Sequence, residues 1–127
     1  MKELDIQIML LRWFRLQYPN ALYNAAQILS SIPLERAKYA GKMKAAGNTS
    51  GWPDIFFAEP RGGFHGLFIE LKSDTAKVFL KKTGAPATDH IAEQLAVLER
   101  LRARGYKAEM CIGFDAAQKV IDDYFNL

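Results

Sequence analysis

The chain has 127 residues, half of them hydrophobic, and its 17 basic and 14 acidic residues leave a formal net charge of +3. This length and composition predict one domain over residues 1–127 with a sizeable core, and the charge permits a polyanionic partner without demonstrating one. A single cysteine excludes an internal disulfide framework. No apolar run reaches the roughly 20 residues that cross a bilayer, and Glu3 and Asp5 stand where a signal peptide would be basic. We therefore expect a cytoplasmic protein without a signal peptide or transmembrane segment.

The first predicted element is a helix from residue 2 to about residue 18 that is apolar around most of its circumference. Pro19 ends this helix. Glu3 and Gln7 lie four residues apart and therefore share one face. Residue type alone favours a polar edge on a buried helix for this pair. A short strand is predicted next, over residues 22–25.

A second helix is predicted from Pro33 to a glycine stop at Gly47, because Ser31 can cap its first turn. A solvated face is the commoner meaning of its basic spacing, and contact with phosphate groups is the alternative. The basic side chains that would make this contact are Lys38, Lys42 and Lys44.

Residues 51–72 form the centre of the predicted fold, because the apolar runs I-F-F-A and L-F-I-E-L-K flank a turn with a glycine pair. This pattern predicts a β-hairpin. In its second strand Glu70 and Lys72 share one face, and such an alternating strand usually faces solvent. Asp54 begins the partner strand, however, so that three charged residues meet at the open end of the hairpin. An apolar hairpin does not need these charges to fold, whereas a metal site would explain them.

The register of the hairpin decides whether Asp54 joins Glu70. An ideal two-residue loop of Gly62 and Gly63 would pair residue 54 with residue 71 and point Asp54 away from Glu70. A three-residue loop over residues 61–63 would pair residue 54 with residue 70, and a β-bulge would do likewise. If the site is real, we therefore predict an odd loop or a bulge.

Two converging carboxylates, Asp54 and Glu70, together with the backbone carbonyl of Leu71, offer hard oxygen ligands suited to Mg²⁺ or Mn²⁺. Lys72 would stand beside the cation, where it can orient or deprotonate an attacking water or neutralise charge on a phosphate. These residue types at this spacing predict metal-assisted hydrolysis of a phosphodiester.

Beyond the hairpin the sequence predicts a mobile excursion over residues 74–87, a helix over residues 90–104, a strand over residues 106–113 and a last helix from Asp115. This order predicts an α/β fold with a mixed sheet flanked by helices, in which the strands joined by the long helix are parallel. The excursion is a candidate lid, dimer arm or ordinary loop. Together with the hairpin tip it supplies the remaining basic side chains proposed for DNA contact: Arg61, Lys77, Lys81 and Lys82.

The sequence P-D at 53–54 followed by E-L-K at 70–72 resembles the PD-(D/E)XK nuclease superfamily. A longer ordered series resembles the virus-type replication-repair nuclease (VRR-NUC) domain over nearly the whole chain. The series comprises Glu3 with Gln7, G-W-P-D, I-E-L-K, then Gln94 with Leu98 and Leu101 before G-Y-K-A-E. Trp52 departs from the small or aliphatic residue expected at its position, and would either stack on a base or simply pack.

The VRR-NUC resemblance implies a restriction-endonuclease-like fold and a phage or bacterial enzyme of DNA repair. It would be a Mg²⁺- or Mn²⁺-dependent, structure-selective endonuclease for branched DNA, such as Holliday junctions or flaps, and would act as a homodimer. The alternatives are a non-catalytic DNA-binding or assembly module on the same fold and a restriction-like enzyme. By this resemblance Asp54 and Glu70 would bind the metal with a further contact from Glu3, Lys72 would be the catalytic lysine, and Gln94 would support the site.

Overall fold

The computed structural model describes residues 1–25 and 41–127. Four strands form one sheet in the order β1-β2-β3-β4. β2 lies antiparallel to both β1 and β3, whereas β3 and β4 are parallel. This is the predicted mixed sheet, in which the two strands that the long helix connects in the sequence are parallel. The elements are α1 (Glu3–Gln17), β1 (Tyr23–Ala25), β2 (Ile55–Phe57), β3 (Leu67–Lys72), α3 (Asp89–Arg102), β4 (Lys107–Ile112) and α4 (Phe114–Phe125).

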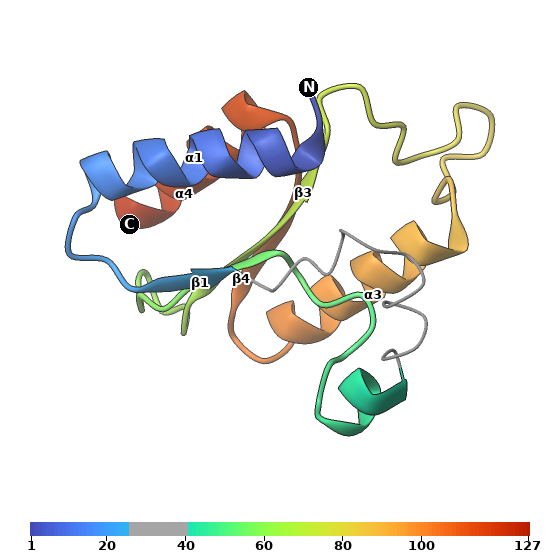
Figure 1. Cartoon of the computed structure of the whole chain (residues 1–127), viewed down its shortest axis with the longest axis horizontal. Coiled ribbons are helices and arrows are strands. Elements are labelled where there is room, and N and C mark those ends of the chain that lie inside the picture. The colour runs from blue at the N-terminus through green and yellow to red at the C-terminus, as the bar shows by residue number, and fades with distance from the viewer. Residues whose placement is uncertain (26–40) are drawn as a thin grey trace.

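The helices cover both faces of the sheet, with α1 and α4 on one side and α3 on the other (Figure 1). Alternate residues of β3 point into these two layers. Leu67, Ile69 and Leu71 join the core under α1 and α4, while Phe68 joins the smaller core under α3. Glu70 therefore lies on the α3 face, where it is 2% exposed. The general tendency of such an alternating strand to face solvent does not hold here, because α3 covers this face of β3.

The N-terminal elements agree with their predicted bounds, but α1 is buried on one face only. Ile6, Leu10 and Phe14 are fully buried against the sheet. Leu4 and Ile8 on the outer face are exposed, so the broad apolar pattern overstated how much of α1 is buried. Among the described residues no helix is long and apolar enough to cross a membrane.

Only the end of the predicted second helix can be compared, since residues 26–40 lie outside the described part of the chain. Residues 41–45 are helical. The helix ends at Gly47 as predicted: the amide of Gly47 donates to the carbonyl of Lys44 at 3.1 Å, and the amide of Asn48 donates to the carbonyl of Met43 at 2.9 Å. This pair of hydrogen bonds is the usual glycine termination of a helix.

The excursion over residues 74–87, predicted to be mobile, is closed by backbone pairing over residues 78–87, where Phe79 and Pro86 form a β-bridge. The amide of Ala87 donates to the carbonyl of Val78 at 2.8 Å, and the amide of Leu80 donates to the carbonyl of Ala85 at 2.8 Å. Val78 is 4% exposed. The alternation of lysine with turn residues hid these backbone pairings, which depend on main-chain geometry more than on side-chain pattern.

The hairpin of β2 and β3 has the register that the site requires. Ile55 pairs with Ile69 and Phe57 with Leu67, so the next residue outward, Asp54, is level with Glu70. At the tip, Arg61 pairs with Phe64 around Gly62 and Gly63, both of which have positive φ angles of 55° and 88°. The tip is thus a two-residue turn, and the one-residue offset arises between the tip and the strands.

This offset confirms the predicted bulge rather than a three-residue loop. Between the tip and the strands, residues 58–60 on one side oppose residues 65–66 on the other. Pro60 fits there because a proline has no amide hydrogen to contribute to a regular ladder. The extra residue turns Asp54 to the side of the sheet on which Glu70 lies.

Gly66 is expected to be essential to this offset. A Cβ atom added there would stand 2.7 Å from the Phe56 ring and 3.1 Å from the Phe57 carbonyl oxygen. We expect Gly66→Ala to lower the free energy of unfolding by roughly 1–3 kcal/mol, measured by urea denaturation. Gly41→Ala is the control, since an added Cβ there meets no atom within 4 Å and alanine favours a helix. Equal stability of the two variants would contradict this role of Gly66.

Candidate active site

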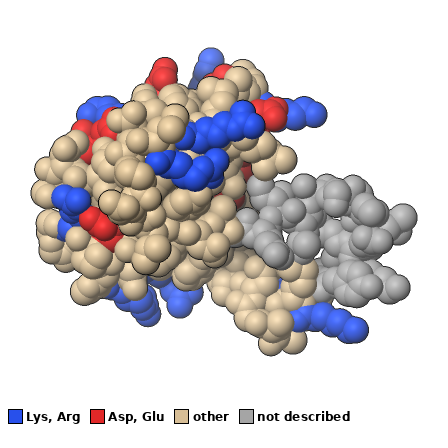
Figure 2. All heavy atoms as spheres, turned by 60° about the vertical axis from the view of Figure 1, so that its left-hand side comes forward, with Lys and Arg blue, Asp and Glu red and all other residues tan. Residues whose placement is uncertain are grey.

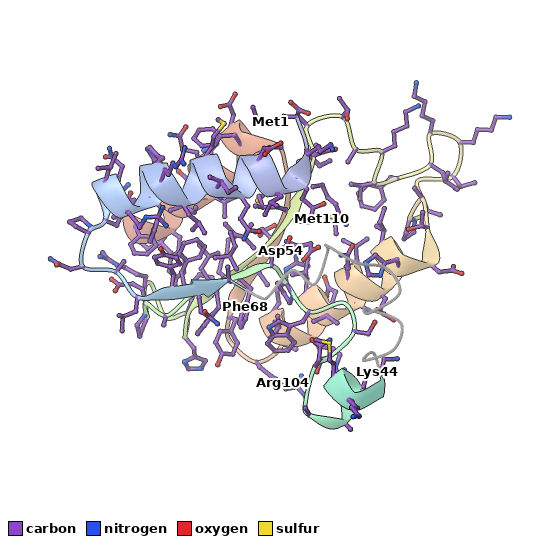
Figure 3. All side chains as sticks on the ribbon, in the orientation of Figure 1. Met1, Lys44, Asp54, Phe68, Arg104 and Met110 are labelled. Atoms are coloured by element: carbon purple, nitrogen blue, oxygen red, sulfur yellow. The ribbon has the colours of Figure 1, made fainter. Side chains whose placement is uncertain are left out.

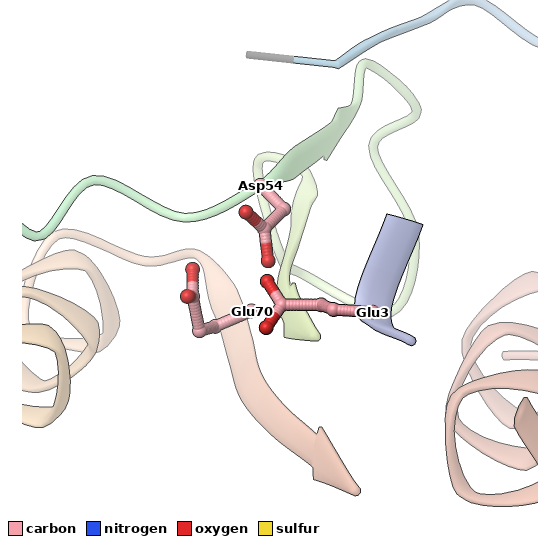
Figure 4. A group of neighbouring side chains, drawn as sticks. All are labelled: Glu3, Asp54 and Glu70. Atoms are coloured by element: carbon pink, nitrogen blue, oxygen red, sulfur yellow. The ribbon is translucent and has the colours of Figure 1, made fainter. Parts of the chain in front are cut away.

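Three carboxylates from separate elements converge at the open end of the β2–β3 hairpin (Figure 4). Glu3 comes from the first turn of α1, Asp54 immediately precedes β2, and Glu70 lies within β3. One carboxylate oxygen of each lies within 4.8 Å of the others. Asp54 is held in place by the Leu71 backbone amide, which donates to its Oδ2 at 2.7 Å. Helix α1 therefore delivers its acidic first turn to the site that the hairpin builds.

Gln94 of α3 connects the second carboxylate to the lysine. Its Nε2 donates to Glu70 Oε1 at 2.5 Å, and its Oε1 accepts from Lys72 Nζ at 2.6 Å. Lys72 Nζ is also 3.8 Å from Glu70 Oε1. Since an amide has one donor end and one acceptor end, Gln94 can satisfy an anion and a cation at the same time. It thereby fixes the separation of Glu70 and Lys72.

Burial and mutual repulsion make these carboxylates unusually weak acids. The pKa of Glu70 is raised to about 9, chiefly by burial and then by the charge of Asp54, while Lys72 opposes both effects. Burial is also the largest cause that raises the pKa of Asp54, against the hydrogen bond from Leu71. The pKa of Glu3 is raised by burial and then by Asp54. A group of acids that resist ionisation beside one another favours the binding of a cation.

The donor set fits a divalent metal ion. Glu70 Oε2 is buried without a hydrogen-bond partner in the part of the chain that the structure describes. A buried carboxylate oxygen that lacks a partner is costly, and a bound cation would satisfy it. Three carboxylates without nitrogen or sulfur ligands are typical of Mg²⁺ and Mn²⁺.

Of the residues predicted to contact DNA, those that the structure describes take no part in this cluster. Arg61 is at the hairpin tip, the end opposite to Asp54, where it pairs with Glu59 at 2.9 Å and lies over the Phe125 ring. Lys38 lies outside the described residues. Figure 2 shows basic and acidic side chains interspersed on one face rather than gathered in a single basic patch. The remaining candidates are exposed: Lys42, Lys44, Lys77, Lys81 and Lys82.

Sequence reasoning missed one residue that positions the site, Glu93 of α3. Its carboxylate accepts a hydrogen bond from the Ser50 hydroxyl. The backbone at Gly51 lies directly against the same side chain. This contact ties the loop before Asp54 to the helix that carries Gln94. An exposed glutamate beside a core stripe gave no signal for it in the sequence.

A solved structure that is similar to this chain matches it along its whole length. It is described as a "VRR_NUC domain protein", with a TM-score of 0.67, 28% sequence identity, and coverage of 100% of this chain and 90% of that chain. No family model matches the sequence, and no curated protein matches it. The fold and the acidic site define a nuclease-type α/β domain. More narrowly, the chain is similar to a VRR-NUC domain, which confirms the resemblance seen in the motif series.

Gln94→Ala is expected to lower the affinity of the site for Mn²⁺ by roughly 10–100-fold, because residues that orient metal ligands have effects of this size. The loss would follow from Glu70 and Lys72 being released from the fixed separation that Gln94 maintains. Isothermal titration calorimetry measures it directly. Gln118→Ala on α4 is the control, and equal affinities in the two variants would show that Gln94 has no such role.

Proposed function

We propose that this chain is a Mg²⁺- or Mn²⁺-dependent, structure-selective DNA endonuclease that hydrolyses phosphodiester bonds of branched DNA. The observation that carries the proposal is the buried Glu70 Oε2, which lacks a partner among the described residues although it lies within a group of three carboxylates. A structural acid would be expected to have its hydrogen bonds satisfied. The similarity to a VRR-NUC domain supports nuclease chemistry at the same place.

The metal ligands in this proposal are Asp54, Glu70 and the backbone carbonyl of Leu71, with Glu3 as a further contact. The Leu71 amide points toward Asp54, and the amide and carbonyl of one residue in a strand face the same neighbouring strand. The Leu71 carbonyl therefore faces the edge that Asp54 occupies. A divalent cation at this site would supply Lewis acidity that activates a water and stabilises charge on the scissile phosphate.

Lys72 has the catalytic role in this proposal. Its Nζ is held by Gln94 Oε1 at 2.6 Å, and its side chain is only 12% exposed. As an ammonium group, Lys72 Nζ orients the attacking water or donates to a phosphate oxygen as negative charge develops; only as a neutral amine, after it has lost a proton, would it take the proton of that water. Gln94 keeps the ammonium group directed past Glu70 rather than in a close ion pair with it, since the Nζ to Oε1 distance to Glu70 is 3.8 Å.

The DNA substrate would extend beyond the site over exposed lysines at both of its sides. Lys77, Lys81 and Lys82 stand on the hairpin that follows β3, and Lys42 and Lys44 on the helical segment before the loop. A symmetric junction is cut most simply by two active sites related by a twofold axis, so we propose that the protein acts as a homodimer. A binding module without catalysis would gain nothing from burying Glu70 in a like-charged group.

The test is a substrate panel of four-way junction, flap and plain duplex, incubated with purified protein in Mg²⁺, Mn²⁺ or EDTA. We expect cleavage of a branched substrate with either metal and no cleavage in EDTA. Products should carry a 5′-phosphate, which ligation of the nicked strand reports. Salt-sensitive DNA binding without cleavage in any metal would replace this proposal with the non-catalytic module.

A further inference from the structure

A hollow of about 260 Å³ opens beside the candidate active site, between the loop that precedes Asp54 and the second half of α3. The carboxylates take no part in it, and the proposed hydrolysis does not use it. Its lining combines one large aromatic ring, an apolar floor and two arginines: Thr49, Trp52, Val97, Arg100, Leu101 and Arg104.

Trp52 offers an aromatic face to a ligand in this hollow. Its side chain is 44% exposed. Its ring stands nearly perpendicular to that of Phe68, with an interplanar angle of 86° and centroids 5.5 Å apart. Perpendicular packing holds the indole in place and leaves at least one of its faces uncovered by Phe68. A fixed, uncovered indole is the kind of surface on which a planar ring stacks.

The hollow is preformed and small. Val97 and Leu101 form its floor and are 9% and 7% exposed. The loop that carries Trp52 is anchored to α3 through Ser50 and Glu93, one helical turn before Val97. The volume of the hollow is below the roughly 300–1,000 Å³ of pockets that take drug-sized ligands. It therefore suits one planar ring rather than a large molecule.

The two arginines give the hollow the positive charge that can bind a phosphate. In the part of the chain that the structure describes, neither Arg100 nor Arg104 has an acidic partner within 4 Å, whereas Arg102 pairs with Glu99 at 2.7 Å. Arg104 Nη1 donates to the Arg100 carbonyl at 3.0 Å, which holds it along the helix. Because the C-terminal end of a helix repels anions, a phosphate at this place depends on these guanidinium groups.

We propose that this hollow binds one unpaired nucleotide of the DNA substrate, with its base stacked on Trp52 and its neighbouring phosphates on Arg100 and Arg104. The inference rests on the proposed nuclease function and names the feature of branched DNA that the site recognises. A base within a duplex presents only its edges, so only a base outside the stack can offer its face to an indole.

The position of the hollow connects it to cleavage. Trp52 precedes Asp54 by two residues, and α3 carries both Gln94 and Arg100. At a rise of 1.5 Å per residue, Arg100 lies about 9 Å from Gln94 along α3, and Arg104 follows just after the helix ends at Arg102. In Figure 3, Phe68 lies between Asp54 and Arg104. The bound nucleotide would therefore lie within a few nucleotides of the cleaved bond, so that branch points with unpaired bases are favoured.

The test measures DNA binding in EDTA, where cleavage cannot contribute, by the fluorescence anisotropy of a labelled oligothymidine and of a labelled blunt duplex. Trp52→Leu keeps an apolar side chain against Phe68 and removes the aromatic face. We expect it to weaken oligothymidine binding by roughly 10-fold and to leave duplex binding unchanged. Trp52→Phe should restore most of the affinity for oligothymidine.

The arginines are tested through salt dependence. Each phosphate contact on a single strand contributes roughly 0.7 to the slope of log K against log salt, so Arg100→Ala with Arg104→Ala should reduce the slope for oligothymidine by about 1.4. Lys119→Ala, which removes an exposed charge from α4, should leave the slope unchanged. The salt dependence of the double arginine variant also tests the nucleotide site if Trp52→Leu fails to fold.

Equal losses on oligothymidine and duplex in Trp52→Leu, or an unchanged slope in the double arginine variant, would overturn the inference. Its failure differs from failure of the nuclease proposal. If the wild-type protein cleaves branched DNA while the Trp52 and arginine variants bind normally, the hollow is not a nucleotide site and the nuclease proposal stands. If these variants lose oligothymidine binding while the wild type never cleaves, the nucleotide site stands and the nuclease proposal fails.

Discussion

Lys72→Ala is expected to lower the rate of DNA cleavage by roughly 10²–10⁴-fold, the range that a positioned acid–base group contributes. The Lys72 ammonium lies beside the three carboxylates of the site, 3.8 Å from Glu70 Oε1, and donates a hydrogen bond to Gln94. Single-turnover cleavage of the branched substrate measures the rate, and anisotropy measures DNA affinity. We expect affinity to change by less than a factor of 10, because one short-range phosphate contact contributes little beside the exposed lysines.

Two further variants distinguish the loss of a catalytic group from the loss of a positive charge. Lys119→Ala removes a lysine of α4 that pairs with Asp123 at 2.8 Å, and it should cleave at the wild-type rate. Asp54→Ala removes a proposed metal ligand and should lower the cleavage rate at least as much as Lys72→Ala does. A Lys72→Ala enzyme that cleaves at the rate of Lys119→Ala would show that the lysine has no catalytic role.

The hairpin shows how far sequence pattern alone can place a site. Alternation in β3 put Glu70 and Lys72 on one face, and the register argument required an offset of one residue between Asp54 and the tip. Both expectations are confirmed. They could be made because strand alternation and turn length are local rules that a few residues decide.

Contacts between residues far apart in the sequence do not follow from these local rules. The position of Glu3 beside Asp54 depends on how α1 packs across the sheet, and residue type alone favoured a polar edge. The burial of Glu70 depends on α3, which covers a face that in an isolated alternating strand would usually be solvated. The link between Ser50 and Glu93 joins residues 43 positions apart. Each of these contacts arises from tertiary packing, which the local pattern does not contain.

The buried carboxylates make the stability of the metal-free protein depend on pH in an unusual direction. The pKa of Glu70 is raised from 4.5 to about 9 in the folded protein. Below pH 4.5 the group is protonated in both the folded and the unfolded chain, so it imposes no penalty. As pH rises toward 9, the folded protein binds more protons than the unfolded chain, and its stability falls. The raised pKa values of Asp54 and Glu3 act in the same direction.

We therefore expect the Tm of the metal-free protein to fall between about pH 5 and pH 9, by roughly 4 °C for each kcal/mol of stability lost. Glu70→Gln should flatten this dependence, because an amide of the same shape does not titrate. Glu109→Gln on β4 is the matched control and should retain the dependence. Differential scanning fluorimetry in EDTA over this pH range measures all three proteins.

Addition of Mn²⁺ should reverse the effect, because a cation binds the ionised carboxylates and displaces their protons. At 100 times its Kd the metal adds about 2.7 kcal/mol to the free energy of unfolding. The rise in Tm should be larger at pH 8 than at pH 6 in the wild type and should be lost in Glu70→Gln. An equal rise in Glu70→Gln would place the metal elsewhere. A flat pH profile in the metal-free wild type would mean that Glu70 is ionised throughout, so that Lys72 and Gln94 alone compensate its charge.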